Sequence, residues 1–129
     1  MSGTQTYLYT YDVGSGDIVQ RTFPDPSSGA WIDGAPSWSG RGDSVLFARS
    51  LASAPTRRDI WELQVSDWTP SMVDDGPTDD ANPVYGPGDQ TLVFCRLVGA
   101  DFHLFIGDVN GVHDLTANLP GNSCEPSWR

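Results

Sequence analysis

One phrase of this sequence occurs twice in full and begins a third time, and that repeat constrains the fold more than any other feature. Residues 35–49 read APSWSGRGDSVLFAR, residues 82–96 read NPVYGPGDQTLVFCR, and residues 125–129 read EPSWR. The second residue of the phrase is a proline in all three copies, and Pro36, Pro83 and Pro126 are separated by 47 and 43 residues. A period of this length is typical of architectures in which each repeat is one supersecondary unit stacked on its neighbours.

Strand-forming residues fill each repeat. Residues 45–48 and 92–95 are apolar on both alternating faces, a pattern that predicts strands covered on both sides. A second set of apolar strands, each followed by a turn and a more polar strand, is predicted at residues 7–12, 60–65 and 102–108. With 14 glycines and 10 prolines to supply turns, the sequence predicts an all-β fold of four-stranded antiparallel units, the blades of a β-propeller.

The expected organisation is one domain over residues 1–129. It comprises a half blade at 7–23, complete blades at 35–74 and 82–116, and a lone first strand at 125–129. About three blades are thus expected, whereas propellers close with about four to eight. Because open blade faces would leave apolar surface in water, either the chain is a piece of a longer propeller or two copies close a six-bladed ring. We expect the homodimer, since two-fold assemblies are the commonest.

The repeated phrase also carries a family resemblance. Pro36-Ser37-Trp38-Ser39, followed by a Gly-Asp turn and Val45–Phe47, resembles the Pro-x-Trp-Ser-Pro-Asp-Gly repeat of TolB-like β-propellers. Residues 102–116, which end in Asp-Leu-Thr, are similar to the second half of such a repeat, and the middle repeat lacks the Leu-Thr ending. The resemblance implies a propeller that serves as an interaction platform, and it is compatible with a periplasmic location.

Ten positions are assigned to the repeat itself, where they turn the chain or pack blades together. They are Pro36, Trp38, Asp43, Phe47, Pro83, Tyr85, Asp89, Phe94, Pro126 and Trp128. Trp38 and Trp128 are expected to pack between blades. Cys95 lies in a predicted core strand, so a buried free thiol is expected, and a bridge to Cys124 is the alternative.

The charge balance narrows the class of partner. The chain has 17 acidic and 7 basic residues and a net charge of −10. Neither nucleic acid nor an anionic membrane surface is therefore an expected partner, because both attract basic patches. The first residues contain neither a basic nor an apolar stretch, so the sequence predicts no secretory signal.

The sequence lacks the common motifs of catalysis. It contains no Gly-x-Ser-x-Gly turn, no Gly-rich phosphate loop and no lysine, and its two histidines are His103 and His113. Two histidines are too few for a histidine metal site. We therefore expect no catalysis within this chain and no cofactor.

Candidate binding residues share one end of the expected blades, because a meander brings its longer loops to the same end. They are Trp31, Asp33, Arg57, Arg58, Asp74, Asp75, Asp79 and Asp80. An exposed Trp beside Arg would anchor a ligand; packing of Trp31 over the blade end is the alternative. For the acidic run at residues 74–80 we expect a solvated loop, with a calcium site as the alternative.

The expected function is that of a non-catalytic binding or scaffold module. A protein or small-molecule ligand would be held on the long-loop face or in the central channel of the ring. The alternative is the propeller portion of a larger enzyme, either a prolyl-oligopeptidase-type hydrolase or a propeller lyase.

Overall fold

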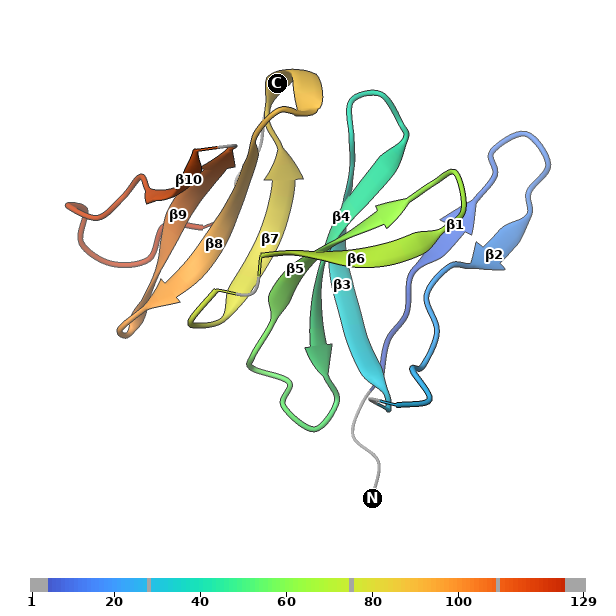
Figure 1. Cartoon of the computed structure of the whole chain (residues 1–129), viewed down its shortest axis with the longest axis horizontal. Coiled ribbons are helices and arrows are strands. Elements are labelled where there is room, and N and C mark those ends of the chain that lie inside the picture. The colour runs from blue at the N-terminus through green and yellow to red at the C-terminus, as the bar shows by residue number, and fades with distance from the viewer. Residues whose placement is uncertain (1–4, 28, 75, 109, 125–129) are drawn as a thin grey trace.

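The chain folds into short β-strands joined by turns, which confirms the predicted all-β class (Figure 1). The computed structural model describes residues 5–27, 29–74, 76–108 and 110–124. The strands are β1 (Tyr9–Tyr11), β2 (Ile18–Gln20), β3 (Trp31–Trp38), β4 (Ser44–Leu51), β5 (Asp59–Gln64), β6 (Thr69–Asp74), β7 (Asp80–Tyr85), β8 (Leu92–Val98), β9 (Asp101–Asp108) and β10 (Gly111–Asp114), with a short 3-10 helix, η1 (Pro87–Asp89), after β7. The lone strand expected around Pro126 and Trp128 lies outside the described residues.

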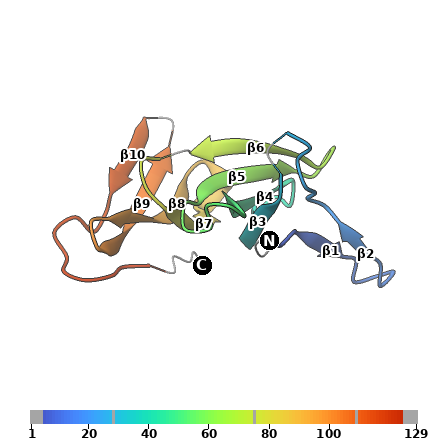
Figure 2. The same cartoon turned by 90° about the horizontal axis from the view of Figure 1, so that it is seen from below.

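The described strands form antiparallel sheets that follow the order of the sequence. Strands β3-β4-β5-β6 make the first blade, β7-β8-β9-β10 make the second blade, and β1-β2 make the N-terminal hairpin. Figures 1 and 2 show the two blades side by side, with the hairpin beyond the first blade. The blades begin at Trp31 and Asp80, earlier than 35 and 82, because these residues already pair with Leu51 and Arg96 at the ends of β4 and β8.

Strand β4 is buried on both faces, as its apolar sequence predicts. One face contributes to a cluster between the two blades that contains Leu46, Ile60 and Phe94. The other face contributes to a cluster with Val45, Phe47 and Leu63, against which Leu8, Trp61 and Trp68 pack. The first blade is therefore packed against the second blade on one side and against the N-terminal segment on the other.

Tyr85 adds a polar link between the blades. Its hydroxyl lies 2.7 Å from the Oγ of Ser44 and donates a hydrogen bond to the carboxylate of Glu62. Burial, together with the hydrogen bond to Glu62, raises the pKa of Tyr85 above its ordinary value. The tyrosine that stands in place of the repeat's tryptophan thus joins the blades by hydrogen bonds as well as by packing.

The two Gly-Asp turns of the repeat have different roles. Asp89 of the second blade accepts hydrogen bonds from the backbone N–H groups of Gly40 and Arg41, at 2.8 and 3.2 Å, and so closes the turn of the first blade. Asp43 accepts a hydrogen bond from within its own turn, at 2.9 Å. That turn also needs Gly42, whose φ of 75° lies in the left-handed region.

Trp38 does not pack between blades, because it is 55% exposed. It borders a hollow that also includes Leu8 and Val45, on the face that the N-terminal hairpin partly covers. The described hairpin has two strands, which leave the edge strand β3 without a facing strand at Trp38. Tyr85, at the same place in the second copy, is partly buried because the complete first blade lies against it.

Cys95 and Cys124 form a disulfide bond, with their Cα atoms 5.4 Å apart, so the expected free thiol is wrong. After β10 the chain turns back along β9, where the N–H of Ser123 donates to the carbonyl of Phe102 at 2.7 Å. The N–H of Phe102 in turn donates to Asn122 Oδ1 at 2.8 Å. This return brings Cys124 next to β8.

Candidate functional site

The longer loops lie at one end of the blades, toward the lower side of Figure 1. Residues 52–58 join β4 to β5 and residues 76–79 precede β7 at this end, whereas β8 and β9 are joined there by a two-residue turn at 99–100. We call this the long-loop end; the turns at residues 39–43 and 86–91 lie at the other end. The starts of β3 and β7 and the ends of β4 and β8 therefore come together at the long-loop end.

Each blade carries a buried Asp–Arg pair at this end. In the first blade, Arg49 Nε and Nη2 donate to the two carboxylate oxygens of Asp33 at 2.6 and 2.8 Å. In the second blade, Arg96 donates to Asp80 in the same way, at 2.7 and 3.0 Å. Both aspartate side chains are 0% exposed. Such two-point pairs fix the geometry of both partners.

Aromatic rings flank each guanidinium group. The Cζ of Arg49 lies 4.7 Å from the ring centre of Trp31 and 4.8 Å from that of Trp61. The Cζ of Arg96 lies 5.1 and 5.0 Å from two phenylalanine rings. Since an aromatic face attracts a cation, the rings and the carboxylate together hold each arginine in place.

The second pair has a third member. Asp74, the last residue of the first blade, accepts a hydrogen bond from Arg96 Nη2 at 3.1 Å. Burial raises the pKa of Asp80 above its ordinary value, although Arg96 opposes this effect, and the hydrogen bond to Asp80 raises the pKa of Arg96. Arg96 therefore binds two carboxylates, one from each blade.

Arg57 and Arg58 tie two loops of the long-loop end together. Arg58 donates to both carboxylate oxygens of Asp79 at 2.8 and 2.6 Å, which raises the pKa of Arg58. Arg57 donates to the backbone carbonyls of Thr78 and Gly76 at 2.6 and 2.5 Å. The loop between β4 and β5 is thereby fixed against the segment that precedes β7.

Two aspartates of the acidic run at residues 74–80 are buried rather than solvated. Asp79 and Asp80 are 7% and 0% exposed, and each is paired with an arginine, so that expectation is wrong for both. Asp79 and Asp80 are not solvated because arginines on the β4–β5 loop and on β8 reach their carboxylates and neutralise them. Asp75 lies outside the described residues.

His103 lies opposite Arg96 on the neighbouring strand β9, but its side chain pairs with another residue. His103 Nδ1 lies 2.7 Å from Asp114 Oδ2, and His113 is exposed. Across the described ranges, no three or more His, Cys, Asp or Glu side chains are grouped so that they could hold a metal ion. The same ranges contain no helix that is long and apolar enough to cross a membrane.

Sequence reasoning missed Arg49, Arg96 and Trp61. A signal for the arginines is present in the repeat, because each aspartate stands three residues before the repeat's proline and each arginine stands two residues after its phenylalanine. Aspartate and arginine are therefore 16 residues apart in both blades. Trp61 carries no such signal, since its position beside Arg49 depends on the pairing of β5 with β4.

Two hollows meet at the first pair. Both are lined by Trp31, Arg49 and Trp61, and their volumes are about 360 and 240 Å³. The larger one also includes Arg21, Phe23, Asp25 and Trp68, and the smaller one Arg57, Asp59 and Met72. Three of the seven basic residues of an acidic chain thus lie around tryptophan side chains at one place.

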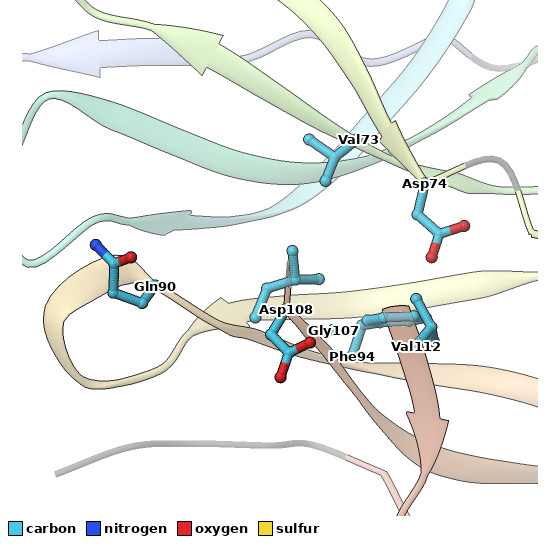
Figure 3. Close-up of a pocket in the computed structure, with 8 residues that line it drawn as sticks. Val73, Asp74, Gln90, Phe94, Gly107, Asp108 and Val112 are labelled. Carbon is cyan, nitrogen blue, oxygen red and sulfur yellow. The ribbon is translucent and has the colours of Figure 1, made fainter. Parts of the chain in front are cut away.

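A third hollow, of about 250 Å³, lies between the blades beside the second pair. Figure 3 shows Val73 and Asp74 above it, on β6, and Gln90, Phe94 and Val112 of the second blade below. The carboxylate of Asp74 reaches from the first blade toward the second (Figure 3).

Comparison with solved structures identifies the fold. No protein-family model and no curated protein matches the chain. Among solved structures, it is similar to TolB from Acinetobacter baumannii, with a TM-score of 0.67 and 24% identity over 87% of this chain and 27% of that one. It is also similar to a TolB protein from Agrobacterium tumefaciens, with a TM-score of 0.67 and 21% identity over 84% of this chain and 40% of that one. The chain spans less than half of either protein, and the likeness confirms the expected TolB-like propeller fold.

Proposed function

We propose that this chain is a non-catalytic binding module whose ligand is held at the long-loop end of the first blade. The observation that carries the proposal is the pair of adjoining hollows built on Trp31, Arg49 and Trp61. Tryptophan and arginine are the side chains most enriched among residues that dominate binding energy. Hollows of a few hundred Å³ lined by aromatic side chains and a few polar groups are the usual form of a ligand site.

The surroundings of these hollows favour a preformed site. The ties from Arg57 and Arg58 hold the loops of this end in place before a ligand arrives. A site that is already ordered loses less conformational entropy when it binds. The TolB-like fold supports the proposal at the level of architecture only.

The same contacts favour binding over catalysis. A carboxylate that serves as a general base must be within reach of its substrate. The carboxylates of Asp33, Asp79 and Asp80 are instead each held by an arginine. In this proposal they are structural groups that position the arginines.

Panning a random peptide library on the 129-residue chain, followed by hydrogen exchange of the complexes, tests the proposed site. We expect bound peptides to protect backbone amides of residues 21–25 and 50–59, which include residues that line the hollows. Trp31→Phe is expected to weaken binding roughly tenfold, because it removes part of an anchoring ring. Arg41→Ala, at the opposite end, is the matched control and is expected to leave binding unchanged. Protection confined to residues 39–43, or no peptide selected at all, would refute the proposal.

In the same proposal, a second copy of the chain covers the open sheet faces. The two strands of the N-terminal hairpin expose four large apolar side chains, namely Tyr9 (59%), Tyr11 (63%), Ile18 (68%) and Val19 (40%). The face-to-face packing of the first blade on the second indicates what such a surface packs against. Because both copies carry a charge of −10, salt is expected to favour their association by screening the repulsion.

A further inference from the structure

The two Asp–Arg pairs differ in what faces them from the preceding sheet. Arg96 binds Asp80 of its own blade and Asp74 of the blade before it. The salt bridge of Arg49 joins it to Asp33, which belongs to its own blade. The surroundings of the two arginines therefore differ in the residue that the preceding sheet has at the position of Asp74.

That position is occupied by Thr22 before the first blade. In the first blade, Asp74 pairs with Ile60 after a bulge in β6. In the N-terminal hairpin, Leu8 stands where Ile60 stands, and its N–H donates to the Oγ1 of Thr22 at 2.8 Å. Thr22 is thus turned to its own hairpin, and it has no carboxylate to offer Arg49.

One edge of the Arg49 guanidinium is left for a ligand. Its Nε and Nη2 donate to Asp33 and its Nη1 donates to no described residue; Arg96 differs in that its Nη2 donates to Asp74 as well as to Asp80. Within the described ranges, every buried side-chain nitrogen or oxygen has a hydrogen-bond partner, so Nη1 is in contact with solvent. Trp31 and Trp61 hold the group in position. Asp25 also lines the hollow, and its Oδ1 accepts a hydrogen bond from the N–H of Ser27.

The hollow between the blades and the larger hollow beside Arg49 share one wall position. Asp74 borders the first and Thr22 borders the second, so the preceding sheet supplies a carboxylate in one case and a hydroxyl in the other. The rest of the two linings differs, since the hollow between the blades includes Leu92, Phe94 and Gly107, whereas the larger hollow includes Trp31, Arg49 and Trp61.

The geometry points to a carboxylate ligand for Arg49. We infer that the larger hollow binds a carboxylate joined to an aromatic group. The carboxylate accepts hydrogen bonds from Arg49, as Asp74 does from Arg96, and the ring lies against the tryptophans. The inference rests on the proposed function and names the chemical class of its ligand. A free aromatic acid and an acidic residue beside an aromatic one in a peptide have the same chemistry.

The unmodified chain tests the inference without any variant. In ¹⁵N-labelled protein, the indole N–H signals of Trp31, Trp61 and Trp68 are followed during titration with indole-3-acetate and with its neutral counterpart, indole-3-acetamide. We expect the acid to shift these signals with an affinity at least roughly tenfold higher than the amide, since a charge-assisted hydrogen bond is lost with the amide. Equal affinities, or no shift with either compound, would overturn the inference.

A variant that supplies the missing carboxylate gives the second test. The carboxylate of Thr22→Asp is expected to pair with Arg49 and to weaken indole-3-acetate binding at least roughly tenfold. Thr22→Asn is the uncharged control and is expected to bind indole-3-acetate as the parent chain does. Binding to the Asp variant as tight as to the parent would contradict the inference. If the Thr22→Asp variant does not fold, the titration of the parent chain with the acid and the amide still decides whether the inference holds.

Two acetylated, amidated peptides identify the source of the carboxylate. The peptide Gly-Trp-Asp-Gly is compared with Gly-Trp-Asn-Gly in the same titration. Binding by the Asp peptide more tightly than by indole-3-acetate assigns the site to a protein segment, and the reverse order assigns it to a free acid. Peptides selected by panning that bind this end without any carboxylate would sink the inference and leave the proposed function standing.

Discussion

Replacing Arg96 by Leu is expected to lower the free energy of unfolding by about 3–5 kcal/mol, because it leaves buried carboxylates without their counter-charge. Asp80 is 0% exposed and receives both of its side-chain hydrogen bonds from Arg96, and Asp74 lies on the same guanidinium. Urea unfolding followed by tryptophan fluorescence measures the loss.

Two further variants show where the loss comes from. Arg41→Leu alters an exposed arginine of a short turn and is expected to change stability by no more than about 0.5 kcal/mol. Adding Asp80→Leu to the Arg96 variant is expected to restore part of the stability, since apolar pairs of similar volume often replace buried ion pairs without loss. A cost for Arg96→Leu as small as that of the Arg41 control would show that the pair does not hold the blade.

Removing the disulfide is expected to cost about 3–4 kcal/mol in the double variant Cys95→Ala, Cys124→Ala, because the bond closes a loop between residues 29 apart in the sequence. The bond restricts the unfolded chain and ties the returning segment at residues 115–124 to β8. Urea midpoints of the parent and the variant under oxidising conditions give the difference.

Reduction is the matched control for that prediction. A reducing agent is expected to lower the midpoint of the parent to near that of the double variant and to leave the variant unchanged. Two titratable thiols in the native, unreduced protein would contradict the bond between Cys95 and Cys124.

Much of the fold could be predicted from the sequence, because strand burial depends on local pattern. A run that is apolar at every position can be satisfied only between two layers, and residues 45–48 of β4 are all buried as that rule predicts. The exposure of Trp38 could not be predicted in this way. Its surroundings depend on how far the neighbouring sheet extends, which its own repeat does not encode.

The partners of charged residues were the least predictable part. The run at residues 74–80 has the composition of a solvated loop, yet its pairing is decided by arginines that come from β8 and from the β4–β5 loop. The bond of Cys95 likewise depends on the return of the chain along β9, which the local sequence does not indicate.

Among the candidate binding residues, Trp31 and Arg57 border the hollows of the long-loop end, as the shared position of the longer loops suggested. Asp33, Arg58, Asp74, Asp79 and Asp80 are engaged in ion pairs of the blades. Arg49, the arginine that faces the hollow, lies within the repeated phrase but was not among the ten positions assigned to turns and packing.

The solution mass of the 129-residue chain tests most directly whether these sheets are consecutive propeller blades whose open faces must be covered. Light scattering is expected to give twice the 14.0 kDa of one chain, and Ile18→Glu on the exposed hairpin is expected to return it to the mass of one. A stable 14.0 kDa species of the parent chain, at every concentration and salt level measured, would contradict the association of these faces.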